Sequence, residues 1–219
     1  DKPDLRPTQA PVAPAPGALI DPATQGVDAF AAYQRGFFVT AFQLALKRVQ
    51  ADKTDAAAMT LLGQLYKEGS GAPRDPKEAA RWFRMASDLG DANAAFALGV
   101  AALKGEGMPV DRALARRMFE KAAEKNQADA LYNLGVMAIE DSGAEPDFKT
   151  AIAYFLRGAG VGNSDCAYSL GVLYHHGRGV ARNDVEAAHW FKQAAEADNV
   201  PGMVEYAIML FNGEGESKD

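Results

Sequence analysis

A fixed interval of 36 residues separates copies of the same short motifs along most of this chain. The pair at Leu62 and Gly63 recurs at Leu98, at Leu134 and at Leu170, each followed by Gly. Self-similarity at a constant period of about 20–50 residues is typical of repeat proteins, whose units pack only on their neighbours. The chain is therefore predicted to be an array of small units rather than a domain built around one central core.

Two further kinds of residue keep the same register as the Leu-Gly pair over four units. They are a helix-capping residue at Asp75, Asp111, Asp147 and Asn183, and a Phe preceded by a large residue at Phe83, Phe119, Phe155 and Phe191. Gly-x-Gly loops recur in the same register, except that the third unit carries Asp141 in place of the first Gly. Glycine readily adopts the positive φ that ends a helix, and Asp or Asn caps the start of the next one.

Each unit is predicted to contain two helices, A and B, separated by the Gly-x-Gly loop. Helix A is expected near 55–67, 91–104, 127–140, 163–176 and 199–212, and helix B near 77–89, 112–125, 148–160 and 184–197. In helix B, Ala79, Phe83 and Ala86 form one apolar stripe, and Trp82 and Trp190 are predicted to pack in the core. A phosphate-binding role for the loops is disfavoured because a helix, not a strand, precedes each of them.

The two ends of the chain differ from the repeats. Residues 1–22 are predicted to be a disordered Pro/Ala-rich leader, 23–53 an N-terminal capping hairpin joined near Gly36, and 54–219 the repeats, four full and a fifth truncated. The fifth unit has helix A without a following helix B, which leaves Val204, Ile208 and Phe211 uncovered. We therefore expect the native chain to continue beyond Asp219.

The motif Leu-Gly-x-x-Tyr-x-x-Gly-x-Gly, followed by Asp and then Ala-x-x-Trp-Phe, resembles the Sel-1-like repeat, a subclass of the tetratricopeptide-type solenoids. The first full unit matches at Leu62, Gly63, Tyr66, Gly69, Gly71, Asp75, Ala79, Trp82 and Ala86. The resemblance implies an all-α, right-handed α-solenoid of antiparallel helical hairpins that acts as a binding scaffold. One cysteine-rich branch of the family is linked to β-lactam binding, but the cysteines of that branch are missing here.

The resemblance also implies that helix A lines a concave face, with three positions of each helix pointing into it. In the central repeats these candidate ligand-groove residues, called the inner stripe below, are Phe96, Val100, Leu103, Tyr132, Val136, Ile139, Tyr168, Val172 and His175. The predicted polar rim consists of Lys104, Glu140, His176 and Asn212. Two interpretations stay open: the stripe binds a ligand, or its side chains only pack on one another.

No constellation of residues predicts catalysis, a cofactor or a metal. His175 and His176 are adjacent and diverge on a regular helix, His189 is expected on the outer side of helix B, and Cys166 takes the place of a small buried residue. The net charge of −6 disfavours nucleic acid, and no apolar run reaches the length of a membrane span.

These observations predict a non-enzymatic scaffold or adaptor that binds a peptide or partner helix on its helix-A face. A cell-wall or β-lactam-associated envelope protein and a spacer domain of a larger envelope protein are the alternatives. A monomer is expected, with association of copies possible through the exposed C-terminal repeat. The absence of an initiator Met and the Pro/Ala-rich start favour the periplasm, with the cytoplasm as the alternative.

Overall fold

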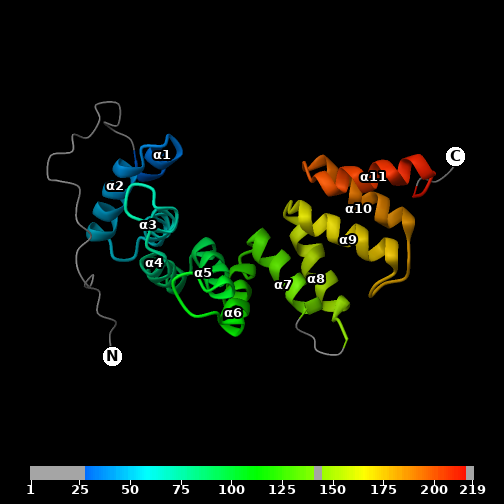
Figure 1. Ribbon diagram of the computed structural model, residues 1–219, viewed down its shortest axis with the longest axis horizontal. Helices are drawn as coiled ribbons and strands as arrows, with labels where there is room; N and C mark the ends of the chain where they lie inside the picture. The colour runs from blue at the N-terminus through cyan, green and yellow to red at the C-terminus, as the bar shows by residue number, and fades with distance from the viewer. Residues whose placement is uncertain (1–27, 141–144, 216–219) are drawn as a thin grey trace. The chain divides into compact units, whose positions relative to one another are not determined.

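The computed structural model describes residues 28–140 and 145–215, and in these residues it contains eleven α-helices and no strand (Figure 1). The predicted leader, 1–22, and Asp141 lie outside the described residues. The helices are α1 (Ala29–Gln34), α2 (Phe38–Ala51), α3 (Ala56–Glu68), α4 (Pro76–Asp88), α5 (Ala92–Lys104), α6 (Arg112–Ala123), α7 (Ala128–Glu140), α8 (Phe148–Gly160), α9 (Ser164–His176), α10 (Asp184–Glu196) and α11 (Val200–Asn212).

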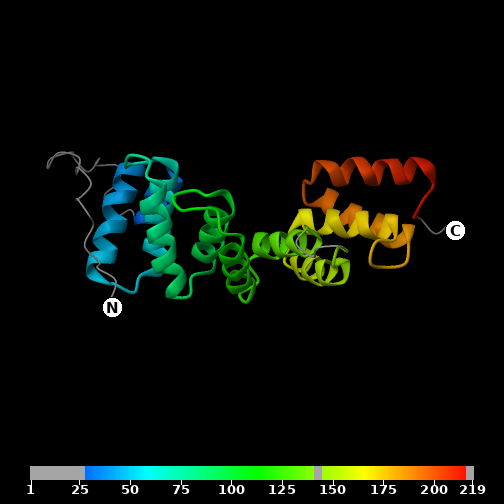
Figure 2. The same cartoon turned by 60° about the horizontal axis from the view of Figure 1, so that its bottom comes forward.

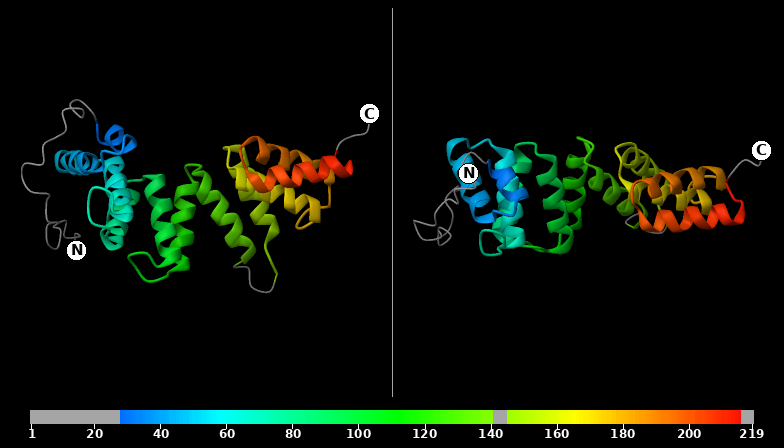
Figure 3. Two further views of the ribbon diagram at one scale, coloured as in Figure 1. Left: turned by 45° about the horizontal axis from the view of Figure 1, so that its top comes forward. Right: turned by 90° about the horizontal axis from the view of Figure 1, so that it is seen from above.

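The chain divides into two compact units, Asp1–Leu89 and Gly90–Asp219. In the first unit α1 pairs with α2 and α3 with α4, and α2 packs on α3. In the second unit the hairpins are α5–α6 (Figure 3), α7–α8 and α9–α10, each packed on the next, and α11 lies alongside α10 (Figure 2). Each unit is thus a stack of helical hairpins, which confirms the predicted all-α repeat architecture.

The predicted capping residues begin the B helices in the way the sequence indicates. The Asp75 carboxylate accepts hydrogen bonds from the backbone N–H groups of Lys77 and Glu78, at 3.0 and 3.1 Å. Asp111, Asp147 and Asn183 accept equivalent bonds at the start of α6, α8 and α10. These bonds satisfy N–H groups that would otherwise have no partner within the helix.

The two glycines of the first Gly-x-Gly loop are required for different physical reasons. Gly69 ends α3 in the left-handed conformation, with φ of 75°, and its N–H bonds to the Leu65 carbonyl oxygen. Gly71 also has positive φ, and a Cβ there would lie 2.2 Å from the Phe38 carbonyl oxygen. The first glycine therefore ends the helix, whereas the second lets the loop approach α2.

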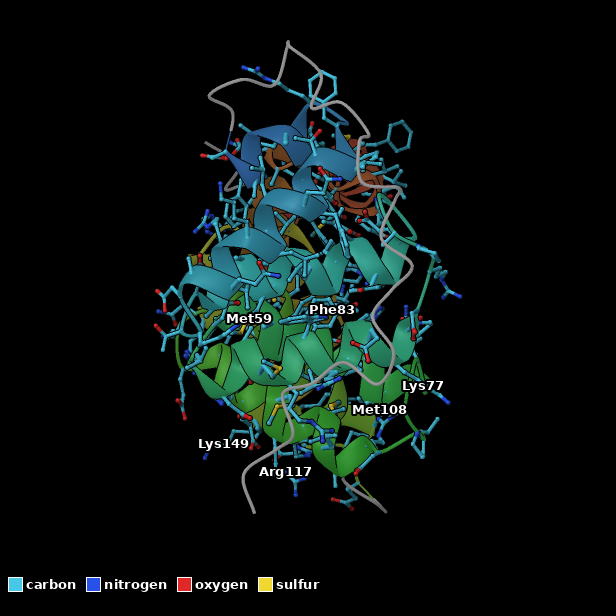
Figure 4. The ribbon with its side chains drawn as sticks, turned by 90° about the vertical axis from the view of Figure 1, so that its left-hand side faces the viewer. Met59, Lys77, Phe83, Met108, Arg117 and Lys149 are labelled. Atoms are coloured by element: carbon cyan, nitrogen blue, oxygen red, sulfur yellow. The ribbon has the colours of Figure 1, made fainter. Side chains whose placement is uncertain are left out.

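The core of each repeat is built around the Phe of helix B. Phe83, Phe119, Phe155 and Phe191 are at most 2% exposed. Figure 4 shows Phe83 and Met59 among the helices of the first unit and Lys77 on its outer side. Trp82 and Trp190, predicted to pack in the core, are only half-buried, and Trp190 packs against the buried core from outside it. The adjacent Phe takes the core position because successive helical residues diverge by about 100°.

The hairpin at the start of the described chain is shorter than the repeats. Helix α1 ends at Gln34 and α2 begins at Phe38, with Gly36 at a φ of 80° between them. The sequence predicts a hairpin within 23–53 that is joined near Gly36, and both helices lie there. That the hairpin of α1 and α2 caps the array stays a prediction.

Candidate functional site

All nine residues of the inner stripe lie in the second unit, on α5, α7 and α9, and all nine are half-buried. None is fully enclosed and none is fully exposed. Side chains that only build a core would be buried, and those of an ordinary solvated face would be polar. The stripe is therefore an apolar surface that the hairpins cover only in part.

On each of the three helices, the first residue of the inner stripe is aromatic, and its ring packs on the core Phe of the same hairpin. The ring centroids lie 5.8 Å apart for Phe96 and Phe119, and 6.0 Å apart for Tyr132 and Phe155. Tyr168 meets Phe191 in the same tilted way at 5.8 Å. Each ring is thus used at least in part for packing, as the packing interpretation requires.

A cleft of about 420 Å³ opens between α7 and α9. Its lining includes four residues of the inner stripe, Val136, Ile139, Tyr168 and Val172. The stripe residues Phe96, Val100, Leu103, Tyr132 and His175 do not line this cleft. The structure therefore brings together two stripe residues of α7 and two of α9, and leaves the α5 part of the stripe outside the cleft.

Several residues of the cleft are missing from the sequence prediction. They are Pro146, Phe148, Phe155, Ser169, Leu173 and Arg178, which come from α8, α9 and the loops beside them, whereas Glu140 was predicted as part of the polar rim. A signal for Phe148 exists in the repeat, because the equivalent positions are Pro76, Arg112 and Asp184. An aromatic residue in that register departs from the pattern of the other repeats.

The two charged residues that line the cleft, Glu140 and Arg178, differ in whether they have an ion-pair partner. The Glu140 carboxylate is paired with the Arg112 guanidinium, at 2.7 Å between the nearest atoms. Arg178 is exposed, and its side chain has no hydrogen bond or ion pair with the part of the chain that the structure describes. Among the described residues that line the cleft, Glu140 already has an ion-pair partner and Arg178 has none, so the Arg178 guanidinium is open to the carboxylate of a ligand. Lys104, His176 and Asn212, the other predicted rim residues, are exposed.

The ninth stripe residue, His175, is held by a polar cluster at the start of α10. Its Nδ1 lies 3.0 Å from Asp184 Oδ1, and Arg182 donates two hydrogen bonds to the same carboxylate. The hydrogen bond from Arg182 is the main cause that holds the pKa of Asp184 below its usual value. His175 is therefore oriented by its neighbours and is less available to a ligand than Val172.

Cys166 lies in the core with no exposed surface, as predicted. Burial raises the pKa of its thiol to about 12, helped by the charges of Asp165 and Asp129. A thiol with such a pKa has almost no thiolate at neutral pH and is a poor nucleophile.

Within residues 28–140 and 145–215, no three His, Cys, Asp or Glu side chains are placed to hold a metal ion. His189 is exposed on α10, the position expected for it. No described helix is both long and apolar enough to cross a bilayer.

The fold and the repeat define a helical-hairpin repeat protein. The family model described as "Sel1 repeat" matches residues 56–91, 92–127, 128–163, 164–199 and 200–219. The chain therefore belongs to the Sel1 repeat family, whose fold commonly serves as a scaffold for protein interactions and is generally non-enzymatic. A search of curated proteins found no match.

Two solved structures are similar to most of the chain. A Sel1 repeat protein from Oxalobacter formigenes is 26% identical with a TM-score of 0.78, over 87% of this chain and 75% of that one. The c5321 protein, a protective antigen of uropathogenic Escherichia coli with an SLR fold, is 27% identical with a TM-score of 0.76. That match covers 90% of this chain but only 44% of c5321.

Proposed function

We propose that this chain is a protein-interaction scaffold whose cleft between α7 and α9 binds an apolar side chain of a peptide or partner helix. The observation that carries the proposal is the half-buried state of Val136, Ile139, Tyr168 and Val172 around an open cleft. Its volume of about 420 Å³ lies within the usual range for ligand sites. Burying apolar surface there contributes about 25 cal/mol per Å² before the costs of association.

The charged residues at the cleft, Glu140 and Arg178, indicate which charge the partner should have. A carboxylate beside the apolar anchor would meet the exposed guanidinium of Arg178 without competing with Glu140, which is already paired with Arg112. Charge-assisted hydrogen bonds between Arg and a carboxylate are among the stronger polar contacts. The partner that fits is therefore a segment with a large apolar residue next to Asp, Glu or a C-terminal carboxylate.

The test is a peptide selection followed by measured affinities. Peptides are selected on the immobilised chain from a random displayed library, and a labelled winner is titrated by fluorescence polarisation. Val172→Glu places a charge inside the cleft and should weaken binding at least about tenfold, roughly 1.4 kcal/mol. Arg178→Glu should lower the affinity for acidic peptides more than the affinity for neutral ones.

Val185→Glu is the matched control, because Val185 is 57% exposed on α10 and does not line the cleft. It should bind as the wild type does. Equal affinities for Val172→Glu and Val185→Glu, with both proteins folded, would remove the cleft from the proposal. The periplasmic location stays a prediction, as does the absence of catalysis.

A further inference from the structure

A pocket in the first unit lies between the second helices of two successive hairpins. Helices α2 and α4 both pack on α3 (Figure 1), and between them opens a hollow of about 210 Å³, called the α2–α4 pocket below. Its apolar lining consists of Leu46, Val49, Trp82 and Met85. None of its residues belongs to the inner stripe or to the cleft between α7 and α9.

The pocket lies where the first full repeat departs from the third and the fourth. The residues 72 and 108 positions after Met85 are Arg157 and Gln193. The Arg157 guanidinium donates a hydrogen bond to the carbonyl oxygen of Ala123, at 2.8 Å. The Gln193 amide donates one to the carbonyl oxygen of Ala159, at 3.2 Å. Both side chains thus reach the B helix of the preceding hairpin, whereas Met85 has no N–H to donate and contributes an apolar wall to the pocket.

The size and the lining of the pocket indicate what it can hold. Pockets for small molecules usually measure about 300–1,000 Å³, so a hollow of about 210 Å³ fits a single side chain better. Indole rings pair favourably with other aromatic rings, and so does the sulfur of methionine. Trp82 and Met85 therefore favour an aromatic side chain as the occupant.

The charged residues of the pocket favour an acidic partner. Glu78 already has an ion-pair partner in Arg81, with 3.5 Å between Oε1 and Nη1. Lys53 is exposed, and its side chain has no hydrogen bond or ion pair with the described residues. A cationic side chain would be repelled by Lys53 and Arg81, whereas a carboxylate next to the bound ring would be attracted to the Lys53 ammonium.

We propose that the α2–α4 pocket is a second docking site, which binds an aromatic side chain of an acidic partner segment. The ring lies among Leu46, Val49, Trp82 and Met85, and a neighbouring carboxylate pairs with Lys53. This site shares no residue with the cleft between α7 and α9. The proposal therefore stands whether or not a peptide binds in that cleft.

The fluorescence of Trp82 tests the site, because the chain has only two tryptophans. Trp190→Phe leaves Trp82 as the single reporter, and the probe is the peptide acetyl-Glu-Glu-Phe-Glu-Glu-amide. Adding it should change the Trp82 emission, and the same peptide with Ala in place of Phe should bind at least about tenfold more weakly. In the wild-type chain, the NMR signal of the Met85 methyl group reports the same binding without a substitution. Both signals unchanged at millimolar peptide, or equal responses to the two peptides, would overturn the proposal.

Charge substitutions test the role of Lys53. Lys53→Glu should weaken binding of the acidic peptide about fivefold or more, because it replaces an attraction by a repulsion. Lys77→Glu is the matched control, since Lys77 is also exposed but does not line the pocket (Figure 4), and it should bind as the wild type does. Equal losses in the two variants, or tighter binding of acetyl-Lys-Lys-Phe-Lys-Lys-amide, would overturn the acidic partner.

Discussion

Gly171 of α9 lies directly against the ring of Phe191 of α10. A Cβ on Gly171 would lie 2.6 Å from both Cδ1 and Cε1 of that ring, well inside van der Waals contact. The glycine of the Leu-Gly pair therefore admits the largest side chain of the core. The two most regular markers of the repeat, the Gly and the Phe, are two halves of one contact.

Gly171→Ala tests this contact. Alanine favours a helix by about 1 kcal/mol over glycine, but overpacking a core typically costs about 1–3 kcal/mol. We expect a net loss of about 1 kcal/mol or more in the free energy of unfolding, measured with urea.

Gly160→Ala is the control for Gly171→Ala. Gly160 is also helical, in α8, and a Cβ there would meet nothing within 4 Å. We expect this substitution to leave stability unchanged or to raise it. If both substitutions stabilise the chain, the proposed packing role of Gly171 is wrong.

Asp75→Ala should destabilise the first unit. The substitution removes the acceptor for the Lys77 and Glu78 N–H groups at the start of α4, and losing such a cap typically costs about 1 kcal/mol. Asp75→Asn should recover most of the stability, because Asn183 performs the same role in α10. Thermal unfolding followed by circular dichroism measures both; equal losses for the two variants would argue against capping.

The Asp184 carboxylate should make stability depend on pH. Its pKa is lowered in the folded chain, first by the hydrogen bond from Arg182 and also by His175. A lowered folded-state pKa contributes stability above the ordinary carboxyl pKa of about 3.9, which is lost as the pH falls through the lowered value. Asp184→Asn should therefore be less stable than the wild type at pH 7, with a smaller difference at pH 3. An unchanged difference between the two pH values contradicts this.

Cys166 should be inert toward iodoacetamide in the folded protein. Its thiol is buried and its pKa is raised to about 12, so very little thiolate is present at pH 8. Mass spectrometry should find no labelling in buffer and one label in urea. In Val185→Cys the added, exposed thiol should react at once, and rapid labelling of wild-type Cys166 in buffer would refute its burial.

Tyr168→Ala should cost stability as well as affinity. The ring packs on Phe191, and an aromatic pair contributes about 0.5–1.5 kcal/mol beyond the area it buries. Tyr168→Phe keeps the ring and should unfold like the wild type. Because the alanine variant changes two properties at once, Val172→Glu is the better probe of binding.

The repeat period, the caps and the glycine positions follow from the sequence because they are local. Asp75 and Gly69 act on backbone groups a few residues away, and the cap recurs in all four full repeats whereas the glycine is absent from the third. The cleft is different. Phe148 and Arg178 depart from the repeat, and only the packing of α7, α8 and α9 brings them beside Val172. The half-burial of Trp190 likewise depends on packing, because Phe191 is the side chain that faces Gly171.

Methyl chemical shifts measured by NMR, with and without a selected peptide, test the proposed binding site most directly. The account predicts that the methyl signals of Val136, Ile139 and Val172 move as the peptide is added. Those of Val110 and Val185, which are exposed and outside the cleft, should stay in place. Shifts confined to residues outside the cleft, with Val136 and Val172 unchanged at saturation, would contradict the account.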